Sequence, residues 1–401
     1  MAADGNFNAF KPKPAHLPFR PFFLAAVVDA FVGAAGWLPS AVGIQAFGAT
    51  AISAGDWHRD LLLFGMVPAV LTGFLLTALP RWTGRQAVLP HTTYLLIALW
   101  VCSRLAFLLL LPSFGLACSA IWILALLLIA ARVVIASRDR RNLKILLLLA
   151  VYCGSNVLVA VSYQVEFALR LALVSIIGLI IIIGGRVVPA LTVAYVESAG
   201  GQVALRRSAA TEYTAVLMTI CALCSWVVAP EAQLTGLACA LAGLSQAIRA
   251  AQWKGWRSLS SSTVLGLHIG YGWIVTGFAF LAIHIFAPAV LGQATAVHAW
   301  TIGAIGTMAL AIMASMIRKH SRLAFVPSAP ATGALAAMTA CCLSRLLIEV
   351  LPAYSGPLAS LSGTLWIVAF GLFLMAYRGT FRGNRGLASI RINKNGGLQC
   401  R

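Results

Sequence analysis

The sequence is poor in charged residues. Charged side chains make up 10% of the 401 residues, and only ten of them are Asp or Glu. Soluble domains carry about 25% charged residues because their surface is hydrated. A chain with so few charges cannot cover a water-facing surface of this size. We therefore exclude a soluble protein and expect the lipid bilayer to be its main solvent.

Three further absences narrow the function classes. The sequence has no adjacent pair of histidines, which excludes a terminal oxidase or nitric oxide reductase, since their binuclear centres use such a pair. Cys221-x-x-Cys224 lies in an apolar run with no second such pair, so it does not predict a zinc site. Residues 1–20 are polar and contain proline, and the first apolar run continues as a full span. We therefore expect no cleavable signal peptide.

Long apolar runs dominate what is present, with 61% of residues hydrophobic and a mean hydropathy of +0.92. A hydrocarbon core of about 30 Å needs roughly 20 apolar helical residues. On this basis we predict an all-α, polytopic membrane protein with about twelve transmembrane helices. The expected spans are 21–40, 61–79, 93–111, 114–135, 143–163, 169–192, 211–229, 232–250, 262–286, 294–316, 332–351 and 357–377.

Basic residues gather in alternate loops between these spans, and the net charge is +19. Cytoplasmic loops carry an excess of Lys and Arg, so the distribution predicts cytoplasmic N- and C-termini. The expected domains are a cytoplasmic segment over 1–20, a twelve-helix transmembrane domain over 21–377 and a basic cytoplasmic tail over 378–401. Because the basic residues form no continuous face, we exclude nucleic acid as a partner.

Two pairs of ionisable residues stand at the outer side of predicted spans. Such residues are costly in lipid and mark candidate functional positions. Glu166 and Arg170, like Arg345 and Glu349, are spaced four residues apart, so each pair can meet on one helix face. The simpler interpretation of both pairs is mutual neutralisation near the membrane interface.

Asp29 and Arg104 are ionisable residues with no charged partner on their own spans. They could pair across helices, which would be an architectural role. Together with twelve spans and glycine-interrupted helices, they also fit a proton- or ion-coupled secondary transporter without metal. That alternative predicts flux in liposomes that depends on Asp29.

Histidines occur near both predicted membrane surfaces. His58, His284 and His298 are expected at the outer side, whereas His268 and His320 are expected at the inner side. A helix rises ~1.5 Å per residue, so His268 and His284 are ~24 Å apart along one span. One metal centre cannot use His268 and the outer group together. Two sites, or one site plus structural histidines, are the alternatives.

Glycines surround two of these histidines. Gly266-x-x-x-Gly270 brackets His268, and His298 is followed by Gly303 and Gly306. Small residues at this spacing let helices approach closely, so packing alone explains the glycines. Glycines on spans that also carry histidines would equally suit a haem, which needs room between helices and imidazole ligands.

Several motifs together resemble the NnrS family, in that family's order. They cover about three quarters of the chain, from the first predicted span to the end of the tenth. The motifs are FRPFFLA at 19–25, WHRDLLLFG at 57–65, TGFLLTALPRWTGR at 72–85, GRVVPALT at 185–192, RAAQWKGWR at 249–257, LHIGYGW at 267–273 and HAWTIGAIGTM at 298–308.

The resemblance implies a multi-pass protein of the bacterial cytoplasmic (inner) membrane that contains haem and copper. It also implies a role in the response to nitric oxide and nitrosative stress, with nitric oxide or a related small molecule as ligand. Whether a reaction is catalysed does not follow from it. His58, His268, His298 and His320 fall on positions where the family has histidine.

We assign axial ligation of a haem to His268, His298 or His58, with Arg186 and Arg81 as partners of its carboxylate groups. Copper is the second candidate metal. Where the family typically has Trp-His-x-His-Glu-Met, this chain has Trp57-His58-Arg59-Asp60-Leu61-Leu62. Asp60 could offer an oxygen to a metal, although carboxylate suits Cu(I) poorly. After span ten, Lys319-His320-Ser321-Arg322 keeps the family's histidine but lacks its glycines. The inner pair of candidate metal ligands, His268 and His320, is therefore better preserved than the outer one.

Overall fold

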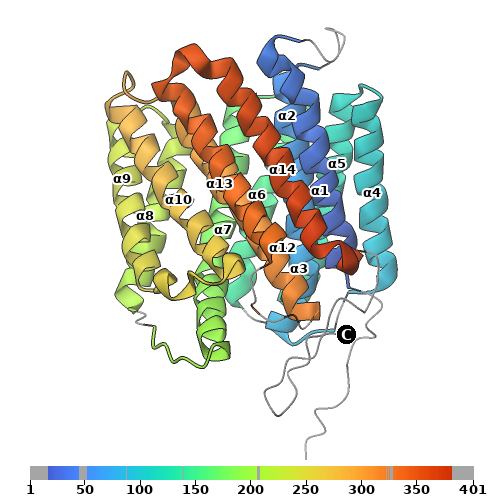
Figure 1. Cartoon of the computed structure of the whole chain (residues 1–401). Coiled ribbons are helices and arrows are strands. Elements are labelled where there is room, and N and C mark those ends of the chain that lie inside the picture. Colours follow the sequence, from blue (N-terminus) through green and yellow to red (C-terminus); the bar gives the residue numbers. More distant parts are fainter. Residues whose placement is uncertain are drawn as a thin grey trace, which may run out of the picture.

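The computed structural model describes residues 17–44, 52–86, 88–138, 140–205, 208–321, 323, 325 and 328–381. Over these residues it contains helices and no strand, and twelve helical segments are long and apolar enough to cross a membrane (Figure 1). The prediction of an all-α protein with about twelve transmembrane helices is therefore confirmed. Most of the expected terminal segments, at 1–16 and 382–401, lies outside the described residues.

Fourteen α-helices, two π-helices and four 3₁₀-helices make up the described chain. They are α1 (Phe19–Trp37), η1 (Leu38–Val42), α2 (Ala54–Leu61), η2 (Leu62–Met66), α3 (Val67–Thr83), α4 (Pro90–Leu108), α5 (Pro112–Ser137), η3 (Arg140–Asn142), α6 (Leu143–Ala160), α7 (Val165–Ser198), α8 (Ala209–Val228), α9 (Gln233–Ala251), η4 (Gly255–Ser258), α10 (Ser262–Phe286), α11 (Gln293–His298), η5 (Ala299–Gly306), α12 (Thr307–Ser321), α13 (Ala329–Val350), η6 (Pro352–Tyr354) and α14 (Ser355–Phe381).

The helices form one bundle in which two composite spans are the most buried. These are α2–η2–α3, over Ala54–Thr83, and α11–η5–α12, over Gln293–Ser321. In Figure 1, α13 and α14 cross in front of α12 and α3. Both composite spans run in the same direction, from the end that the sequence predicts to be outside the cell to the cytoplasmic end. We call these the outer end and the inner end.

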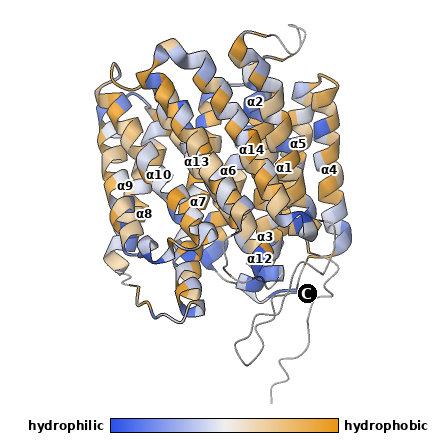
Figure 2. Ribbon diagram, in the orientation of Figure 1, coloured by the Kyte–Doolittle hydropathy of each residue, from blue (hydrophilic) through white to orange (hydrophobic). Residues whose placement is uncertain are grey.

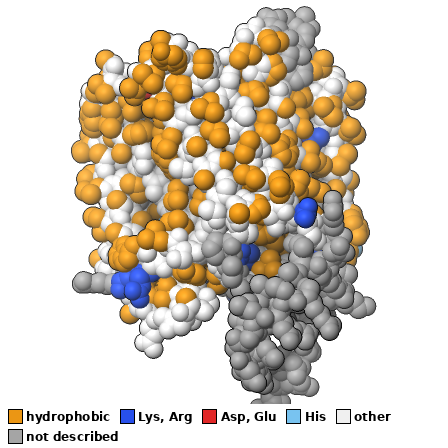
Figure 3. Space-filling model, in the orientation of Figure 1, with side chains coloured by type: hydrophobic (Ala, Val, Ile, Leu, Met, Phe, Trp, Pro, Cys, Tyr) orange, Lys and Arg blue, Asp and Glu red, His pale blue; other side chains and the backbone are white. Residues whose placement is uncertain are grey.

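The lateral surface of the bundle is apolar. Large hydrophobic side chains are exposed on many helices, among them Leu105 on α4, Leu128 on α5 and Leu217 on α8. Hydrophobic side chains cover most of the face in Figure 3, with Lys and Arg mainly toward its lower edge. Figure 2 shows the same pattern, with hydrophilic segments gathered near the lower ends of α3, α12 and α7. Such a belt is what a lipid environment requires.

Span two begins earlier than predicted. We expected it at 61–79, with His58 before it, but α2 begins at Ala54, where the side chain of Ser53 caps the helix by accepting from the N–H of Asp56. Arg59 is ion-paired with both Asp56 and Asp60, at 2.6 and 2.7 Å. These ion pairs neutralise the charges of Asp56, Arg59 and Asp60. Because the three residues lower the mean hydropathy, the sequence did not indicate the start of the helix. His58 is consequently inside the span.

The ends of spans two and ten also differ from the prediction. We expected Pro80 to end span two, but α3 continues to Thr83 and ends at Gly84, which has the left-handed φ of 66°. The N–H of Arg85 closes this end by donating to the carbonyl of Pro80. Span ten continues to Ser321 instead of ending at 316, so His320 lies in its last turn. In span two, α3 continues past Pro80 because a proline so close to the end of a helix removes few backbone hydrogen bonds.

Each central composite span contains a π-helix near its outer end. The η2 segment follows His58 by three residues, and η5 begins directly after His298. Tyr152 on α6 donates its hydroxyl hydrogen to the carbonyl of Leu63 in η2. Such insertions are rare and frequently occur at functional sites. Here both lie beside histidines that the sequence singles out.

Asp29 and Arg104 form a buried ion pair between α1 and α4, which confirms the cross-helix pairing that the sequence suggests. Their nearest charged atoms are 3.3 Å apart. Trp100 also donates to Asp29 at 2.8 Å, and Ser103 accepts from Arg104 at 2.7 Å. The backbone of Gly65 in η2 lies directly against this pair, since a Cβ there would be 2.1 Å from Nη1 of Arg104. The pair therefore braces the first π-helix.

Candidate functional site

The outer half of the bundle encloses a cavity of about 490 Å³. We call it the outer cavity. Its wall comes from α1, α2, η2, α3, α7, α8, α11, η5, α13 and α14. Ligand pockets in proteins usually have volumes of about 300–1,000 Å³ and apolar walls with a few polar groups. The outer cavity has this size and composition.

His58 enters the cavity wall from α2. Its ring lies 5.2 Å from the ring of Trp37, and both side chains line the cavity. Nδ1 of His58 is buried and makes no hydrogen bond of normal geometry, although the backbone of Gly33 is near it. A buried imidazole nitrogen without a partner is costly unless a ligand satisfies it. His58 thus brings an imidazole with a buried, unpartnered nitrogen to the cavity wall.

His298 faces the same cavity from the beginning of η5. Its Nδ1–H donates to the carbonyl of Ala294 at 2.6 Å, one helical turn earlier. In a neutral imidazole this bond leaves Nε2 as the unprotonated nitrogen. Metal-binding histidines usually donate their second N–H to a carbonyl in this way, which fixes the ring and its tautomer. His298 therefore has the local geometry of a ligand.

Guanidinium groups of α7 and α13 add positive charge to the cavity. Arg170 and Arg345 line it and have no ion pair among the described residues. Nε of Arg170 is buried without a hydrogen-bond partner. The expected local pairing of Arg345 with Glu349 is not seen: Glu349 instead accepts from the N–H of Gly292 and from Thr295. Two such guanidinium groups suit carboxylate or phosphate groups.

The cavity wall carries further polar groups. Glu166 lies one turn before Arg170 on α7, but no ion pair joins the two side chains within 4 Å. Nε1 of Trp226 is buried without a partner, and the thiol of Cys341 is 3.4 Å from the hydroxyl of Ser362. Arg59, Gln293 and Thr301 also line the cavity, and the rest of the wall is largely aliphatic and aromatic. The cavity can thus accommodate a mostly apolar ligand with an anionic edge.

The donor set fits a metal held partly by its own organic ligand better than a bare metal ion. In the part of the chain that the structure describes, no three His, Cys, Asp or Glu side chains are grouped to hold an ion. His58 and His298 are two imidazoles from different spans in one cavity. A haem supplies four ring nitrogens and needs only one or two protein ligands. The two histidines meet that requirement, and the guanidinium groups of Arg170 and Arg345 would pair with the carboxylate groups of a haem.

His268 is at the inner end and is enclosed by protein. Thr192 donates its hydroxyl hydrogen to the carbonyl of Val188 at 2.9 Å and lies 2.8 Å from Nε2 of His268. His268 must therefore donate Nε2–H to Thr192. Its Nδ1 packs against Gly255, where a Cβ would be 2.7 Å away. The ring does not line the outer cavity.

The family-like motifs around His268 interlock at this inner end. Nη1 of Arg249 on α9 donates to the hydroxyl of Tyr271 at 2.8 Å, and Arg249 is ion-paired with Glu212 at 2.7 Å. A Cβ at Gly185 would be 2.0 Å from Nη2 of Arg249, so a larger residue there would displace the guanidinium. The ring of Trp253 contacts that of Tyr271 at 4.5 Å. Three motifs, at 185–192, 249–257 and 267–273, thus build one buried polar network.

The other predicted site residues are also away from the outer cavity. His320 packs its ring on Phe19 at 5.1 Å at the end of α12. Arg186 donates to Asn142 at 2.7 Å and lies over the ring of Trp82, while Arg81 is exposed at the end of α3. Asp60 is buried and ion-paired with Arg59. None of these four side chains lines the cavity that holds His58 and His298.

A family profile described as NnrS protein matches residues 14–385. The chain belongs to the NnrS family. No curated protein matches it. Two of the NnrS-like motifs, at 57–65 and 298–308, supply His58, His298 and both π-helices of the outer cavity. The motifs at 185–192, 249–257 and 267–273 build the inner network, so the NnrS-like motifs contribute both to the outer cavity and to the inner end.

Sequence reasoning missed several cavity residues. Trp37, Trp226 and Cys341 carry no signal that distinguishes them from core residues of apolar spans. Arg170 and Arg345 were recognisable as ionisable residues in or beside spans, but we assigned them to local pairs. Only the packing of distant spans brings them around one space.

Proposed function

We propose that the outer cavity binds a haem and that the protein acts in the response to nitric oxide. Two imidazoles from separate spans in one cavity, His58 and His298, are the observation that carries this proposal. Haem iron binds nitric oxide, as does Cu(I), which remains the second candidate metal. The site would lie in the cytoplasmic membrane of a bacterium.

His58 and His298 are the proposed iron ligands. Nε2 of His298 is available because its Nδ1–H is engaged by the carbonyl of Ala294. The His58 ring is held by the Trp37 ring and keeps an unsatisfied nitrogen. The π-helices η2 and η5 shift the register of the two central spans just beyond these histidines. Both imidazoles are thereby positioned by buried helices, which keeps them preorganised.

Arg170 and Arg345 are the proposed partners of the anionic edge of the ligand. We expected Arg81 and Arg186 in this role, but both are at the inner end, and Arg186 is already bonded to Asn142. Arg170 and Arg345 line the cavity without ion pairs among the described residues. In the low dielectric of the bundle, their charges would attract carboxylates strongly.

The surroundings of His268 and His320 favour one of the two alternatives that the sequence left open, namely a single site with the remaining histidines in structural roles. His268 donates to Thr192 and packs against Gly255, so it holds η4 and α7 together at the inner end. We accordingly propose that its role is structural. Asp60 is proposed to keep Arg59 in place through their ion pair, not to bind metal.

The visible spectrum of purified protein, with its iron and copper content, tests the proposal. Expression with ample haem should yield a Soret band that His58→Ala and His298→Ala each reduce or shift. His284→Ala is the matched control, since His284 is at the same end but bonds the carbonyl of Leu291 outside the cavity. A colourless, metal-free preparation would reject the proposal. Loss of the band in His268→Ala alone would move the site to the inner end.

A further inference from the structure

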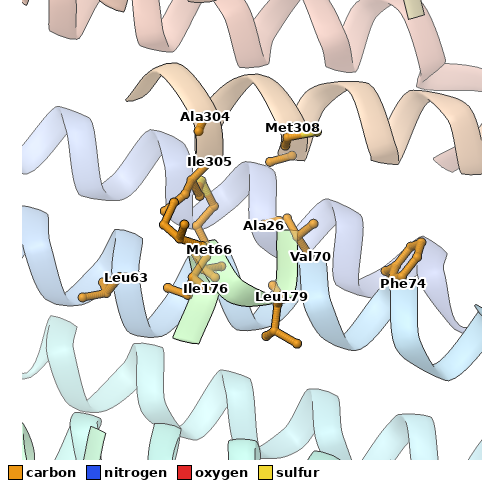
Figure 4. Close-up of a cluster of buried hydrophobic side chains, with 14 of the residues drawn as sticks. Ala26, Leu63, Met66, Val70, Phe74, Ile176, Leu179, Ala304, Ile305 and Met308 are labelled. Carbon is orange, nitrogen blue, oxygen red and sulfur yellow. The ribbon is translucent and has the colours of Figure 1, made fainter. Parts of the chain in front are cut away.

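A second, smaller cavity lies between α3, α7 and α12, directly inward of the outer cavity. Its volume is about 80 Å³, and we call it the lower chamber. Its wall includes Val70 and Phe74 on α3, Leu179 on α7 and Met308 on α12. Figure 4 shows these side chains among the buried cluster that joins the three helices. The chamber is thus inside the membrane-spanning part of the bundle.

Every side chain in the wall of the lower chamber is apolar. The wall consists of Met, Val, Leu, Ile, Phe, Ala and Gly only. Buried polar groups need hydrogen-bond partners, and this wall offers no side chain that could serve. Apolar cavities of such composition stay dry and bind small apolar molecules or xenon. An ion or a strongly hydrated molecule would lose its hydrogen bonds to water there and gain none from the chamber wall.

The lower chamber adjoins the outer cavity. Met66, Val67 and Ile305 belong to the walls of both. Met66 is the last residue of η2, and Ile305 lies in η5. In Figure 4, Met66, Ile176 and Ile305 lie close together. The side chains that separate the two spaces therefore come from the same π-helices that follow His58 and His298.

The two spaces have opposite chemistry. The outer cavity contains the guanidinium groups of Arg170 and Arg345, whereas the lower chamber has no charged side chain in its wall. Partly accessible residues of the chamber wall, such as Leu71, Ile180 and Ile312, lie on three different helices. A small molecule that dissolves in lipid would gain contacts in the chamber, and a hydrated ion would not.

We propose that the lower chamber binds a small uncharged molecule of diatomic size, of the class of dissolved gases, and delivers it to the histidines of the outer cavity from the membrane side. The binding step does not depend on a metal. Delivery to a metal rests on the function proposed above. The side chains of Met66 and Ile305 separate the two spaces and must move to let the molecule pass.

Xenon is the probe for the binding step. Saturable xenon binding should be detectable by xenon NMR on the detergent-purified, metal-free protein. Val70→Phe should lower xenon affinity by at least about tenfold, because the added ring occupies the chamber. Val368→Phe is the matched control: it is the same substitution on the lipid-facing side of α14, where Val368 is 41% exposed. Ala309→Leu, which fills the chamber from α12, should act in the same direction.

The outcomes separate the two proposals. The double variant His58→Ala/His298→Ala should lose metal but keep its xenon site. If wild-type protein carries metal, Val70→Phe should also slow nitric oxide association, and Val368→Phe should not. Absence of saturable xenon binding in all proteins would overturn the chamber proposal while leaving the metal site intact. A co-purified lipid acyl chain filling the chamber would overturn it as well.

Discussion

The guanidinium of Arg104 lies 3.3 Å from the carboxylate of Asp29, with both side chains buried between α1, α4 and the first π-helix. The two residues are 75 positions apart, and neither has a charged partner on its own helix. Their pairing neutralises two charges in the membrane and places a rigid polar group against Gly65.

Removal of either partner should destabilise the protein strongly. Asp29→Ala leaves the Arg104 charge buried and uncompensated, for which a loss of about 3–5 kcal/mol is typical. Thermal unfolding in detergent measures the effect. The double variant Asp29→Ala/Arg104→Met should lose less than the sum of the single variants, since no unpaired charge remains. Additive losses would argue against a direct pair.

Proton- or ion-coupled flux in metal-free liposomes that disappears in Asp29→Asn would favour the transporter alternative.

Gly65→Ala should disturb the first π-helix. The new methyl group would be 2.1 Å from Nη1 of Arg104 and 2.8 Å from Oδ2 of Asp29, so one of them must move. We expect lower thermal stability and less bound metal. Gly154→Ala on α6 is the matched control, because nothing lies within 4 Å of a Cβ there. Alanine in a helix interior is usually better than glycine by about 0.5–1 kcal/mol, so this control should be neutral or stabilising. Equal behaviour of the two variants would contradict the close contact.

Arg345→Gln should weaken binding of a carboxylate-bearing ligand in the outer cavity. A hydrogen bond to a charged group contributes about 1.5–3 kcal/mol, which corresponds to an affinity loss of roughly ten- to a hundredfold. Titration of metal-free protein with haem measures this affinity. Arg378→Gln, at the inner end of α14, is the charge-matched control and should bind normally. Unchanged haem affinity in both Arg345→Gln and Arg170→Gln would show that neither guanidinium binds the anionic groups of the ligand.

Thr192→Val should destabilise the inner network without reducing metal content. It removes the acceptor for Nε2–H of His268, and an unsatisfied buried donor costs about 1–3 kcal/mol. Thermal unfolding and metal analysis on the same preparation separate the two effects. Thr364→Val on α14 is the control, since its exposed hydroxyl bonds only the carbonyl of Ser360. Metal loss in Thr192→Val at unchanged stability would show that His268 has a direct role at the metal.

Hydropathy was sufficient to predict the twelve spans, because each span is a long apolar segment. It failed at the start of span two, where Arg59 and Asp60 lower the local average although they neutralise each other. The cross-helix pair of Asp29 and Arg104 followed from the high cost of lone charges in lipid. The π-helices could not be predicted, since they depend on contacts such as that of Tyr152 with Leu63, 89 residues away in sequence.

The candidate site was predictable only in part. His58 and His298 were recognisable as intramembrane histidines in family-like motifs, and the structure places both in one cavity. The partners of the haem's carboxylate groups were assigned to Arg81 and Arg186, because the depth of these residues in the membrane was known but their neighbours were not. His268 looked equivalent to His298 in sequence. Only the positions of Thr192 and Gly255 show that its Nε2 is bonded to protein and that its Nδ1 packs closely against η4.

The two π-helices make the central spans sensitive to length in an unusual way. Each α-helical residue turns the chain by about 100°, so deleting one residue from η2 or η5 would rotate the segment before it by that angle relative to the rest of the span. His58 or His298 would then leave its wall, even though every remaining residue kept its identity. Counting residues between the histidine and the glycines that follow is thus as informative for related sequences as matching the histidine itself.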